Sequence, residues 1–537
     1  MYIERRVQKK EIPMIVQQAK THVVISLFSF GCFVCMCGMV GFQLVTNRKR
    51  DIDGIKRKGP RIIVIGGGPG GSAVAATLLK WDHRVAVTVF DGNRTQELTT
   101  HYALAAAGHR SYDLVTRGPS TLCCPTSWTV TRDANLVLRA ITSVNPNKQT
   151  VIDSSGEEHR YDALVIASGA QRDISVIRGL HAGNVDRDFV SLYPHGIRDS
   201  LMSTFFGNVL AVRVATRSNF ETMDATRSHP GYWMSVVNTS WKFLQHFGRI
   251  GPKQTTTFSA ITSDACICDQ LSSDYNGAIE GHWLSRGINV ITGLRLEEVD
   301  VSRRVARFRD NSKSEHKLPE GSTHQHEKDG TRIIDIPFRM MILDLPLKAP
   351  AFIEQSGLST SRTAGFVDVD SQTLQHRQFS NVFALGDSAA IDVAKSYGAT
   401  LSQVPIVAEN VLRMLDFQRR NGDESKIAPQ QLTKYNGYSS FSINMTTWRV
   451  MWPEMEGFGT ISRSVEGLPK LKRSACHVWD DSNWAGPKGV LQGVFFQLFV
   501  FEFMHWFFSV KGSWDPQHWF RDNRPSQNPE AESLQNA

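Results

Sequence analysis

The strongest constraint on the fold is a glycine-rich turn, Gly66-Gly-Gly68-Pro-Gly-Gly71, that joins an apolar segment to a run of small residues. The segment before it, Arg61–Ile65, predicts a short buried strand, and the residues after it, Ser72–Leu79, predict a helix. In this order Gly66 permits a tight turn, Gly68 lets a pyrophosphate approach the backbone, and Gly71 lets the helix pack against the strand. The turn therefore predicts a phosphate-binding site at a helix N-terminus.

Three later segments predict contacts with the remaining parts of a dinucleotide. A second apolar strand, Val85–Phe90, ends in Asp91, whose carboxylate is placed to accept hydrogen bonds from adenosine ribose hydroxyls. A third strand ends at a small-residue turn containing Gly169, where the chain crosses back beside the cofactor. A fourth ends in Gly386-Asp387, where the glycine admits close backbone approach and the carboxylate can bind a polyol hydroxyl. Segments of these kinds in this order favour FAD over NAD.

These motifs resemble the FAD-dependent pyridine nucleotide-disulfide oxidoreductase superfamily, and within it the mitochondrial-type sulfide:quinone oxidoreductase family. The resemblance runs from about Arg61 to Phe520 and is plainest in 364–387 and 394–403. It implies an FAD flavoprotein in which Asp387 binds the ribityl chain. It also implies that Lys395 is a catalytic residue near flavin and quinone, where a cation can stabilise the reduced flavin.

The expected fold class is α/β, with two Rossmann-like, doubly wound dinucleotide-binding domains. At 537 residues the chain exceeds what one hydrophobic core usually organises. The FAD-binding domain is expected in two parts, 60–190 and 350–420, around a second Rossmann-like domain over 200–345. In that second domain the strand 208–215 is followed by bulky residues in 216–231 and by no GxGxxG motif. NAD(P)H binding there is therefore disfavoured.

Both ends of the chain predict contact with a membrane. A basic segment, 1–20, precedes a transmembrane helix over 21–47, a stretch without Lys, Arg, Asp or Glu that could instead belong to a targeting segment. The region 430–520 is expected to associate with the membrane through helices, chiefly the Phe-rich stretch 489–510, for which a packed core helix is the alternative. The tail 522–537 is expected to be disordered. Membrane lipid follows as a partner, and the resemblance implies the mitochondrial inner membrane as the location.

The family's cysteine pair is missing from this sequence. The resemblance implies one cysteine directly after the Gly-Asp motif, where this chain has Ser388, and another after the second-domain strand. No cysteine lies between Cys124 and Cys266. A serine hydroxyl cannot replace a thiol in disulfide exchange, so the usual sulfide chemistry of the family is not expected from these residues. The pairs Cys123-Cys124 and Cys266-Ile-Cys268 are poorly spaced for an unstrained disulfide, and we interpret them as structural.

Three functional hypotheses result. The first is a membrane-bound oxidoreductase that passes electrons from a small donor, sulfide by resemblance, through FAD to quinone. The second is a catalytically impaired relative with a structural or binding role, and the third and weakest is an NADH:quinone reductase. No zinc-finger spacing or basic-aromatic repeat points to nucleic acid. His324 and His326 lie in a polar segment expected to be an exposed hairpin, so no metal is assigned, and the oligomeric state is left open.

Overall fold

The computed structural model describes the following residues: 59–97, 123–181, 190–191, 208–214, 229–246, 256–268, 271, 273–312, 316–326, 331–422, 427–441, 443–446, 449–451, 453–458 and 470–471. The predicted segments 1–20, 21–47, 489–510 and 522–537 lie outside them. Within the described residues, no helix combines the length and the apolar character that crossing a membrane requires.

The first lobe is built on a five-stranded parallel sheet in the order β21-β9-β1-β2-β5. Its strands are β1 (Arg61–Ile65), β2 (Ala86–Phe90), β5 (Asn135–Val137), β9 (Ala163–Ile166) and β21 (Val382–Ala384). Strand β1 lies between β2 and β9 and is buried from Ile62 onward, as an apolar run in a parallel sheet requires. Strand β21 joins the sheet only after the chain has passed through the second lobe.

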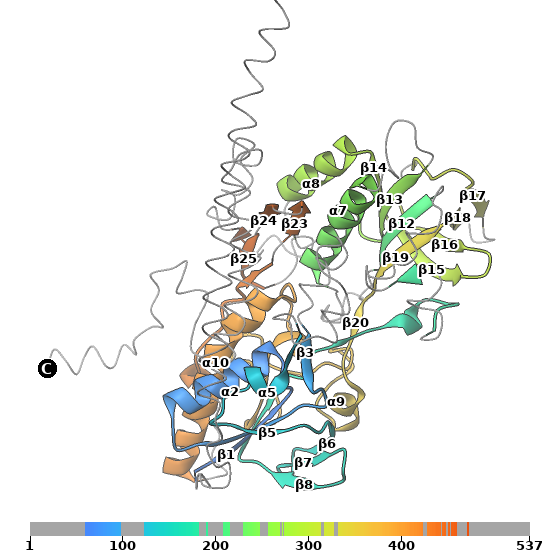
Figure 1. Cartoon of the computed structure of the whole chain (residues 1–537). Helices are drawn as coiled ribbons and strands as arrows, with labels where there is room; N and C mark the ends of the chain where they lie inside the picture. Colours follow the sequence, from blue (N-terminus) through green and yellow to red (C-terminus); the bar gives the residue numbers. More distant parts are fainter. Residues whose placement is uncertain are drawn as a thin grey trace, which may run out of the picture.

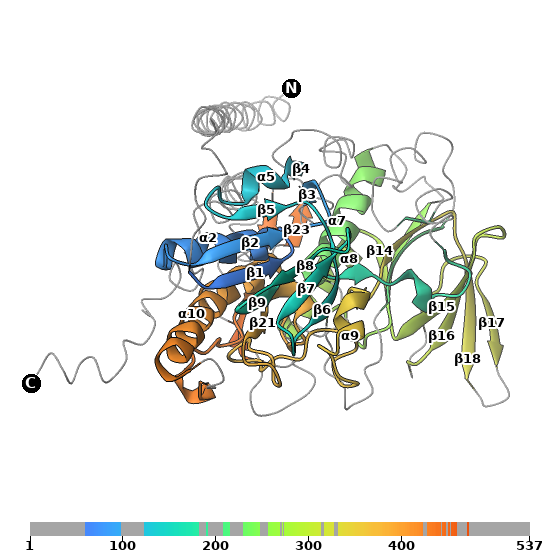
Figure 2. The same ribbon diagram turned by 90° about the horizontal axis from the view of Figure 1, so that it is seen from below.

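Helices cover one face of this sheet, and an antiparallel meander lies against the other (Figures 1 and 2). The helices are α2 (Pro69–Trp81) and α10 (Tyr397–Asn421), which pack against each other. The meander consists of β6 (Ile141–Asn145), β7 (Thr150–Asp153) and β8 (Glu158–Arg160). Because α2 is rich in Gly, Ala and Ser, it approaches both the sheet and α10 closely.

The second lobe repeats the plan with a parallel sheet in the order β11-β19-β12-β13-β14. Its strands are β11 (Val190–Ser191), β12 (Asn208–Arg213), β13 (Thr257–Thr262), β14 (Ile288–Thr292) and β19 (Met340–Asp344). Helices α7 (Pro230–His246) and α8 (Ser273–Ser285) pack on one face. A four-stranded sheet packs on the other, formed by β15 (Leu294–Asp300), β16 (Val305–Asp310), β17 (Thr323–His326) and β18 (Arg332–Pro337).

The side chains of β12 point alternately to the two faces of the sheet and so contribute to two separate layers of the second lobe's core. Val209 and Ala211 face the α7 and α8 helices, whereas Leu210 and Val212 face the four-stranded sheet. Successive strand residues point to opposite faces, so an apolar run such as this one has both faces buried. The two parallel sheets with these covers confirm the predicted α/β class.

A short ribbon connects the lobes. It pairs β10 (Gln171–Arg172) with β20 (Leu347–Lys348) in antiparallel fashion where the chain leaves and re-enters the first lobe (Figure 1). Beside it, Arg172 lies 3.5 Å from Asp344, and Asp344 lies 3.6 Å from Arg213 at the end of β12. These buried ion pairs tie the ribbon to the carboxyl edge of the second sheet.

The remaining elements are short. They are α5 (Thr126–Thr129), α9 (Ala351–Gln355), η2 (Ile174–Val176), η3 (Gly386–Ser388), η4 (Pro429–Gln431), β3 (Thr95–Glu97), β4 (Cys123–Pro125), β22 (Ser439–Ser440), β23 (Ile443–Thr446), β24 (Arg449–Met451), β25 (Glu454–Glu456) and β26 (Lys470–Leu471). The prediction that His324 and His326 lie in an exposed hairpin is confirmed, since every residue of β17 is exposed.

Candidate active site

The glycine turn is shaped by close backbone contacts. Gly66 has a φ of +104°, which residues with a side chain rarely adopt, and its N–H donates to the Phe90 carbonyl at 2.7 Å. A Cβ on Gly66 would collide with the carbonyl of Ala167, and one on Gly71 would collide with the carbonyl of Gly66. These two positions therefore need glycine for the fold itself.

Gly68 differs from these two glycines. A Cβ built there meets no atom within 4 Å, so packing of the chain does not explain why the residue is glycine. Gly68 is the N-cap of α2, with Pro69 as the first helical residue, and the helix begins here with unpaired N–H groups. Open space in front of a helix N-terminus fits the pyrophosphate of FAD.

Gly67 is held on both sides of its peptide by polar side chains. Its N–H donates to Asp91 Oδ2 at 2.7 Å, and its carbonyl accepts from Ser72 Oγ at 2.6 Å and from Gln96 Nε2. Gln96 is 5% exposed and also lies 3.1 Å from Ser72 Oγ, while its Oε1 has no hydrogen-bond partner. Sequence reasoning missed Gln96, because its spacing from the turn carries no motif.

Asp91 lies at the carboxyl end of β2, as a ribose-binding acid requires. Burial raises the pKa of Asp91, whereas hydrogen bonds from the N–H groups of Asn93 and Gly67 oppose the shift. Each carboxylate oxygen accepts one of these bonds, at 2.7 Å in both cases. Because a carboxylate oxygen has two lone pairs, both oxygens keep acceptor capacity for hydroxyl groups.

The two later glycines lie at the same edge of the first sheet. Gly169 has a φ of +68° and open space at its Cβ position. Gly386 has a φ of +65°, and its N–H donates to Gln403 Oε1 at 2.7 Å, which joins this turn to α10. The ends of β1, β2, β9 and β21 thus bring together the glycine turn, Asp91 and both later turns, where open α/β sheets bind ligands.

Lys395 is a buried cation beside the Gly-Asp turn. It is 4% exposed, and its Nζ donates to the carbonyls of Asp387 at 2.7 Å and Ala389 at 3.3 Å. The ammonium also lies 4.7 Å from the centre of the Phe366 ring. Burial lowers the pKa of Lys395 to about 8, and the Asp387 carboxylate opposes the shift. A lysine kept here has a cost in desolvation, which suits a role toward a negatively charged group.

Asp387 meets a residue that the sequence gave no reason to select. His229 Nε2 lies 2.8 Å from Asp387 Oδ2, across 158 residues of chain and between the two lobes. Burial by itself raises the pKa of Asp387, but the His229 ring and the Lys395 ammonium outweigh it and lower the pKa to about 2. The carboxylate is therefore ionised at neutral pH. Its second oxygen remains available for the ribityl hydroxyl that the resemblance implies.

Ser388, at the family's cysteine position, is completely buried. Its hydroxyl lies 3.0 Å from the Ile166 carbonyl and 2.9 Å from the Leu385 carbonyl, and donates toward these backbone oxygens. These bonds hold the turn against the end of β9. The hydroxyl thus has a structural role in this conformation.

In the second lobe, charged side chains occupy the carboxyl edge of the sheet. Arg213, 2% exposed, ends β12 and lies 3.6 Å from Asp344 and 3.9 Å from Asp264. Nearby, Cys268 is buried, and its peptide N–H and carbonyl both bond to the Asn276 side chain, at 2.9 and 2.8 Å. This pattern agrees with the structural interpretation of Cys268. The segment 216–228 and the side chains of Cys123 and Cys124 lie outside the described residues.

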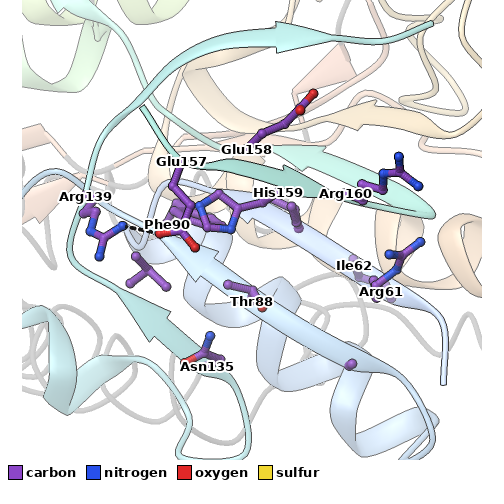
Figure 3. A pocket seen from close by; sticks show the side chains of 13 residues that line it. Arg61, Ile62, Thr88, Phe90, Asn135, Arg139, Glu157, Glu158, His159 and Arg160 are labelled. Atoms are coloured by element: carbon purple, nitrogen blue, oxygen red, sulfur yellow. Dashed lines mark hydrogen bonds and ion pairs between the residues drawn. The ribbon is translucent and has the colours of Figure 1, made fainter. Parts of the chain in front are cut away.

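A cavity of about 720 Å³ lies between the first sheet and the meander (Figure 3). Asp153, Glu157 and His159 at its edge bring their ligand atoms within 4.8 Å of one another. However, the Arg139 guanidinium lies 2.8 Å from both carboxylates and already forms ion pairs with them. We assign no metal to this cluster, and none of the cavity's lining residues belongs to the glycine turn or the Gly-Asp turn.

Comparisons with known proteins agree with this geometry. Residues 60–193 match the pyridine nucleotide-disulphide oxidoreductase family. The chain is 24% identical over 400 residues to mitochondrial sulfide:quinone oxidoreductase of Mus musculus, covering 74% of this chain and 78% of that protein. Its fold is similar to that of sulfide:quinone oxidoreductase from Aquifex aeolicus, with a TM-score of 0.59 and 13% identity over 87% of this chain and 96% of the other.

A second solved structure is similar to the same degree. A chain in the structure of the Tetrahymena thermophila mitochondrial ATP synthase has a TM-score of 0.59 and 17% identity, over 88% of this chain and 100% of that one. At this identity the likeness concerns the fold.

The fold, the nucleotide turns and these matches define the class: the protein is an FAD-dependent oxidoreductase, and its residues 60–193 match the pyridine nucleotide-disulphide oxidoreductase family. Within this class it is similar to the mitochondrial sulfide:quinone oxidoreductases, at 22–24% identity over 70–84% of the chain. The predicted class, cofactor and resemblance are confirmed. The roles of individual site residues stay predictions, and the following variants test them.

The first test separates glycines needed for the fold from glycine needed for the ligand. We expect G71A to lower the free energy of unfolding by roughly 2 kcal/mol or more, because its Cβ meets a backbone carbonyl. G68A should leave the stability of the apoprotein unchanged and weaken FAD binding about tenfold or more, since its Cβ enters the phosphate space. FAD titration and chemical denaturation measure both. G277A, in open space on α8, is the control and should bind FAD normally.

The second test concerns Ser388. Removing its hydroxyl in S388A leaves two buried carbonyls with one donor fewer, so we expect stability to fall by about 1–2 kcal/mol. FAD content and the rate of flavin reduction by dithionite should remain within about twofold of wild type. A large loss of flavin reduction at unchanged stability would show instead that the hydroxyl takes part in the chemistry.

The third test uses the pKa of Lys395. Between pH 8 and 10.5 the folded apoprotein has released this proton while the unfolded chain still binds it, so stability rises with pH. We expect the free energy of unfolding of wild type to gain roughly 2–3 kcal/mol over K395M across this window. Denaturation of both proteins from pH 7 to 10 measures the difference. A constant difference would contradict a buried, shifted lysine.

Proposed function

We propose that this chain is a mitochondrial, membrane-associated oxidoreductase that takes electrons from a small donor and passes them through FAD to quinone. The observation that supports it most is Lys395, a buried cation beside the Gly-Asp turn that packing alone does not require. The curated relatives are named mitochondrial sulfide:quinone oxidoreductases, from Mus musculus to Dictyostelium discoideum. Sulfide and quinone come to this chain as proposals through that likeness.

The residues of the site divide the work. When bound, FAD accepts two electrons from a donor and gives them up to an acceptor. Gly68 and the start of α2 hold its pyrophosphate, Asp91 its adenosine ribose and Asp387 its ribityl chain. Lys395 places a positive charge near the ring system, where negative charge accumulates on reduction. Gly169, which has open space at its Cβ position, keeps a side chain out of the space that the cofactor needs.

The proposed transfer of electrons from the donor to the flavin does not use a pair of protein thiols. Disulfide exchange needs two sulfur atoms near the flavin, one to accept sulfur from the donor and one to leave. Ser388 is buried and turned toward backbone carbonyls, and the described part of the second lobe presents His229 toward the Gly-Asp turn. A donor that gives electrons directly to the flavin suits these residues better than one that first forms a persulfide on the protein.

Quinone and membrane lipid are proposed as partners because of the predicted membrane segments. Quinone is apolar and is delivered from the bilayer, so an acceptor site next to 21–47 and 489–510 is consistent with the proposal. The mitochondrial inner membrane is the proposed location, since it contains quinone and since the curated relatives are named as mitochondrial.

A second candidate is a relative that keeps FAD and has lost catalysis, with a structural or binding role. The serine at the cysteine position, turned away into a backbone contact, favours it. A similar fold also occurs in a chain of the Tetrahymena thermophila mitochondrial ATP synthase structure. An NADH:quinone reductase is weaker, because no GxGxxG motif follows the strand 208–215 and because Arg213 at the end of β12 is already paired with Asp264 and Asp344.

An anaerobic titration of the detergent-solubilised holoprotein decides among these functions. Sulfide is added first, then NADH, and decylubiquinone last, while the visible absorbance of the flavin is followed. We expect sulfide or another small thiol to bleach the flavin and decylubiquinone to restore it. NADH should leave it oxidised. A flavin that dithionite bleaches but no physiological donor does would favour the non-catalytic relative, and a chain without flavin would refute the proposal.

A further inference from the structure

His229 occupies a fixed position between the two lobes. It immediately precedes α7, and its carbonyl accepts hydrogen bonds from the N–H groups of Tyr232 at 3.1 Å and Trp233 at 3.3 Å. Its side chain, 18% exposed, reaches the first lobe, where Nε2 lies 2.8 Å from Asp387 Oδ2. The helix start thus fixes the backbone of His229, and the carboxylate fixes its ring.

The contact with Asp387 selects one form of the imidazole. A carboxylate ionised at neutral pH can only accept, so Nε2 must carry the hydrogen in both the neutral and the charged ring. In the neutral ring Nδ1 is then the acceptor, and no hydrogen-bond partner is assigned to it among the described residues. A base whose second nitrogen is held by a carboxylate is oriented to take up a proton.

Few charged groups surround this ring in the described part of the chain. Asp387 on η3 contacts it, and the Lys395 ammonium binds the backbone carbonyl of the same aspartate. On the ribbon side, the Arg172 guanidinium lies 4.4 Å from the centre of the Tyr232 ring in the first turn of α7. With a neutral ring the His229–Asp387 pair therefore carries one negative charge, which an imidazolium would balance.

We propose that His229, oriented by Asp387, is the proton acceptor of the flavin site. The inference rests on the proposed function and deepens it, because it assigns the donor to the class of two-electron donors that also release protons. His229 is not among the sequence-predicted site residues, and its role follows from the contact with the flavin-motif aspartate.

The proton balance is simple. A donor DH2 that is oxidised to D gives up two electrons and two protons. The two electrons and one proton go to the flavin, and the second proton goes to His229 Nδ1, which forms an ion pair with Asp387. Reoxidation by quinone takes up two electrons and two protons, one of them from His229, and so restores the neutral ring.

The test measures protons rather than turnover. The midpoint potential of the bound flavin is determined by spectroelectrochemistry from pH 5.5 to 8.5, without any donor. With two protons taken up per two electrons the potential falls by about 59 mV per pH unit, and with one proton by about 30 mV. We expect wild type to follow the two-proton slope through neutral pH and H229Q to follow the one-proton slope. Glutamine keeps an N–H near the Nε2 position but cannot titrate.

A matched control is available in the first lobe. His159 Nε2 also bonds to an aspartate, Asp153 at 3.1 Å, but in the meander, where it is not part of the proposed site. H159Q should follow the wild-type slope. Identical slopes in wild type and H229Q would overturn the inference, as would a one-proton slope in wild type. If H229Q fails to fold, H229N provides the same comparison. A wild-type chain that binds no FAD would overturn the proposed function itself, a distinguishable result.

Discussion

The close approach of α2 to β1 is the constraint on which the rest of the first lobe depends. Gly71 packs against the Gly66 carbonyl, and Gly66 against the Ala167 carbonyl, with no room for a Cβ at either glycine. This contact brings the helix start to the carboxyl edge of the sheet. It also fixes the ends of β1 and β9 relative to each other, and Ser388 anchors the Gly-Asp turn to the same place through the Ile166 carbonyl. One set of backbone contacts thus positions both the proposed phosphate site at the start of α2 and the Gly-Asp turn at 386–387.

Charge at this edge is arranged at a cost to folding. Lys395 is desolvated and satisfied mainly by backbone carbonyls, and Asp387 stays ionised because its contacts with His229 and Lys395 outweigh its burial. Removing a lysine of this kind relieves desolvation, whereas keeping it supplies a fixed positive charge where electrons arrive. Gly68 is likewise not required by the apoprotein: an alanine would fit there, but its Cβ would occupy the space proposed for a ligand. Features that the apoprotein does not need are the strongest structural argument for a bound cofactor.

Local sequence was sufficient for the parts of this architecture that depend on short spacing. The turn at 66–71, the acid at the end of β2 and the strand before Gly386 were all predictable, because each combines an apolar strand with small residues at a fixed offset. His229 was not predictable, since its partner lies 158 residues away and only the packing of two lobes brings them together. Gln96 was missed for a similar reason, as its amide meets the Gly67 carbonyl through β3, a three-residue strand without a hydrophobic pattern.

The loss of the cysteine pair has a different meaning once these contacts are known. If the site were merely decaying, one would expect polar groups near the missing thiols to lose their partners. Instead a histidine from the second lobe, His229, is hydrogen-bonded to Asp387. Sulfur exchange moves atoms and electrons together, whereas an imidazole moves only protons. A site of this composition is therefore suited to a donor whose electrons enter the flavin directly, with the protein responsible for the accompanying proton.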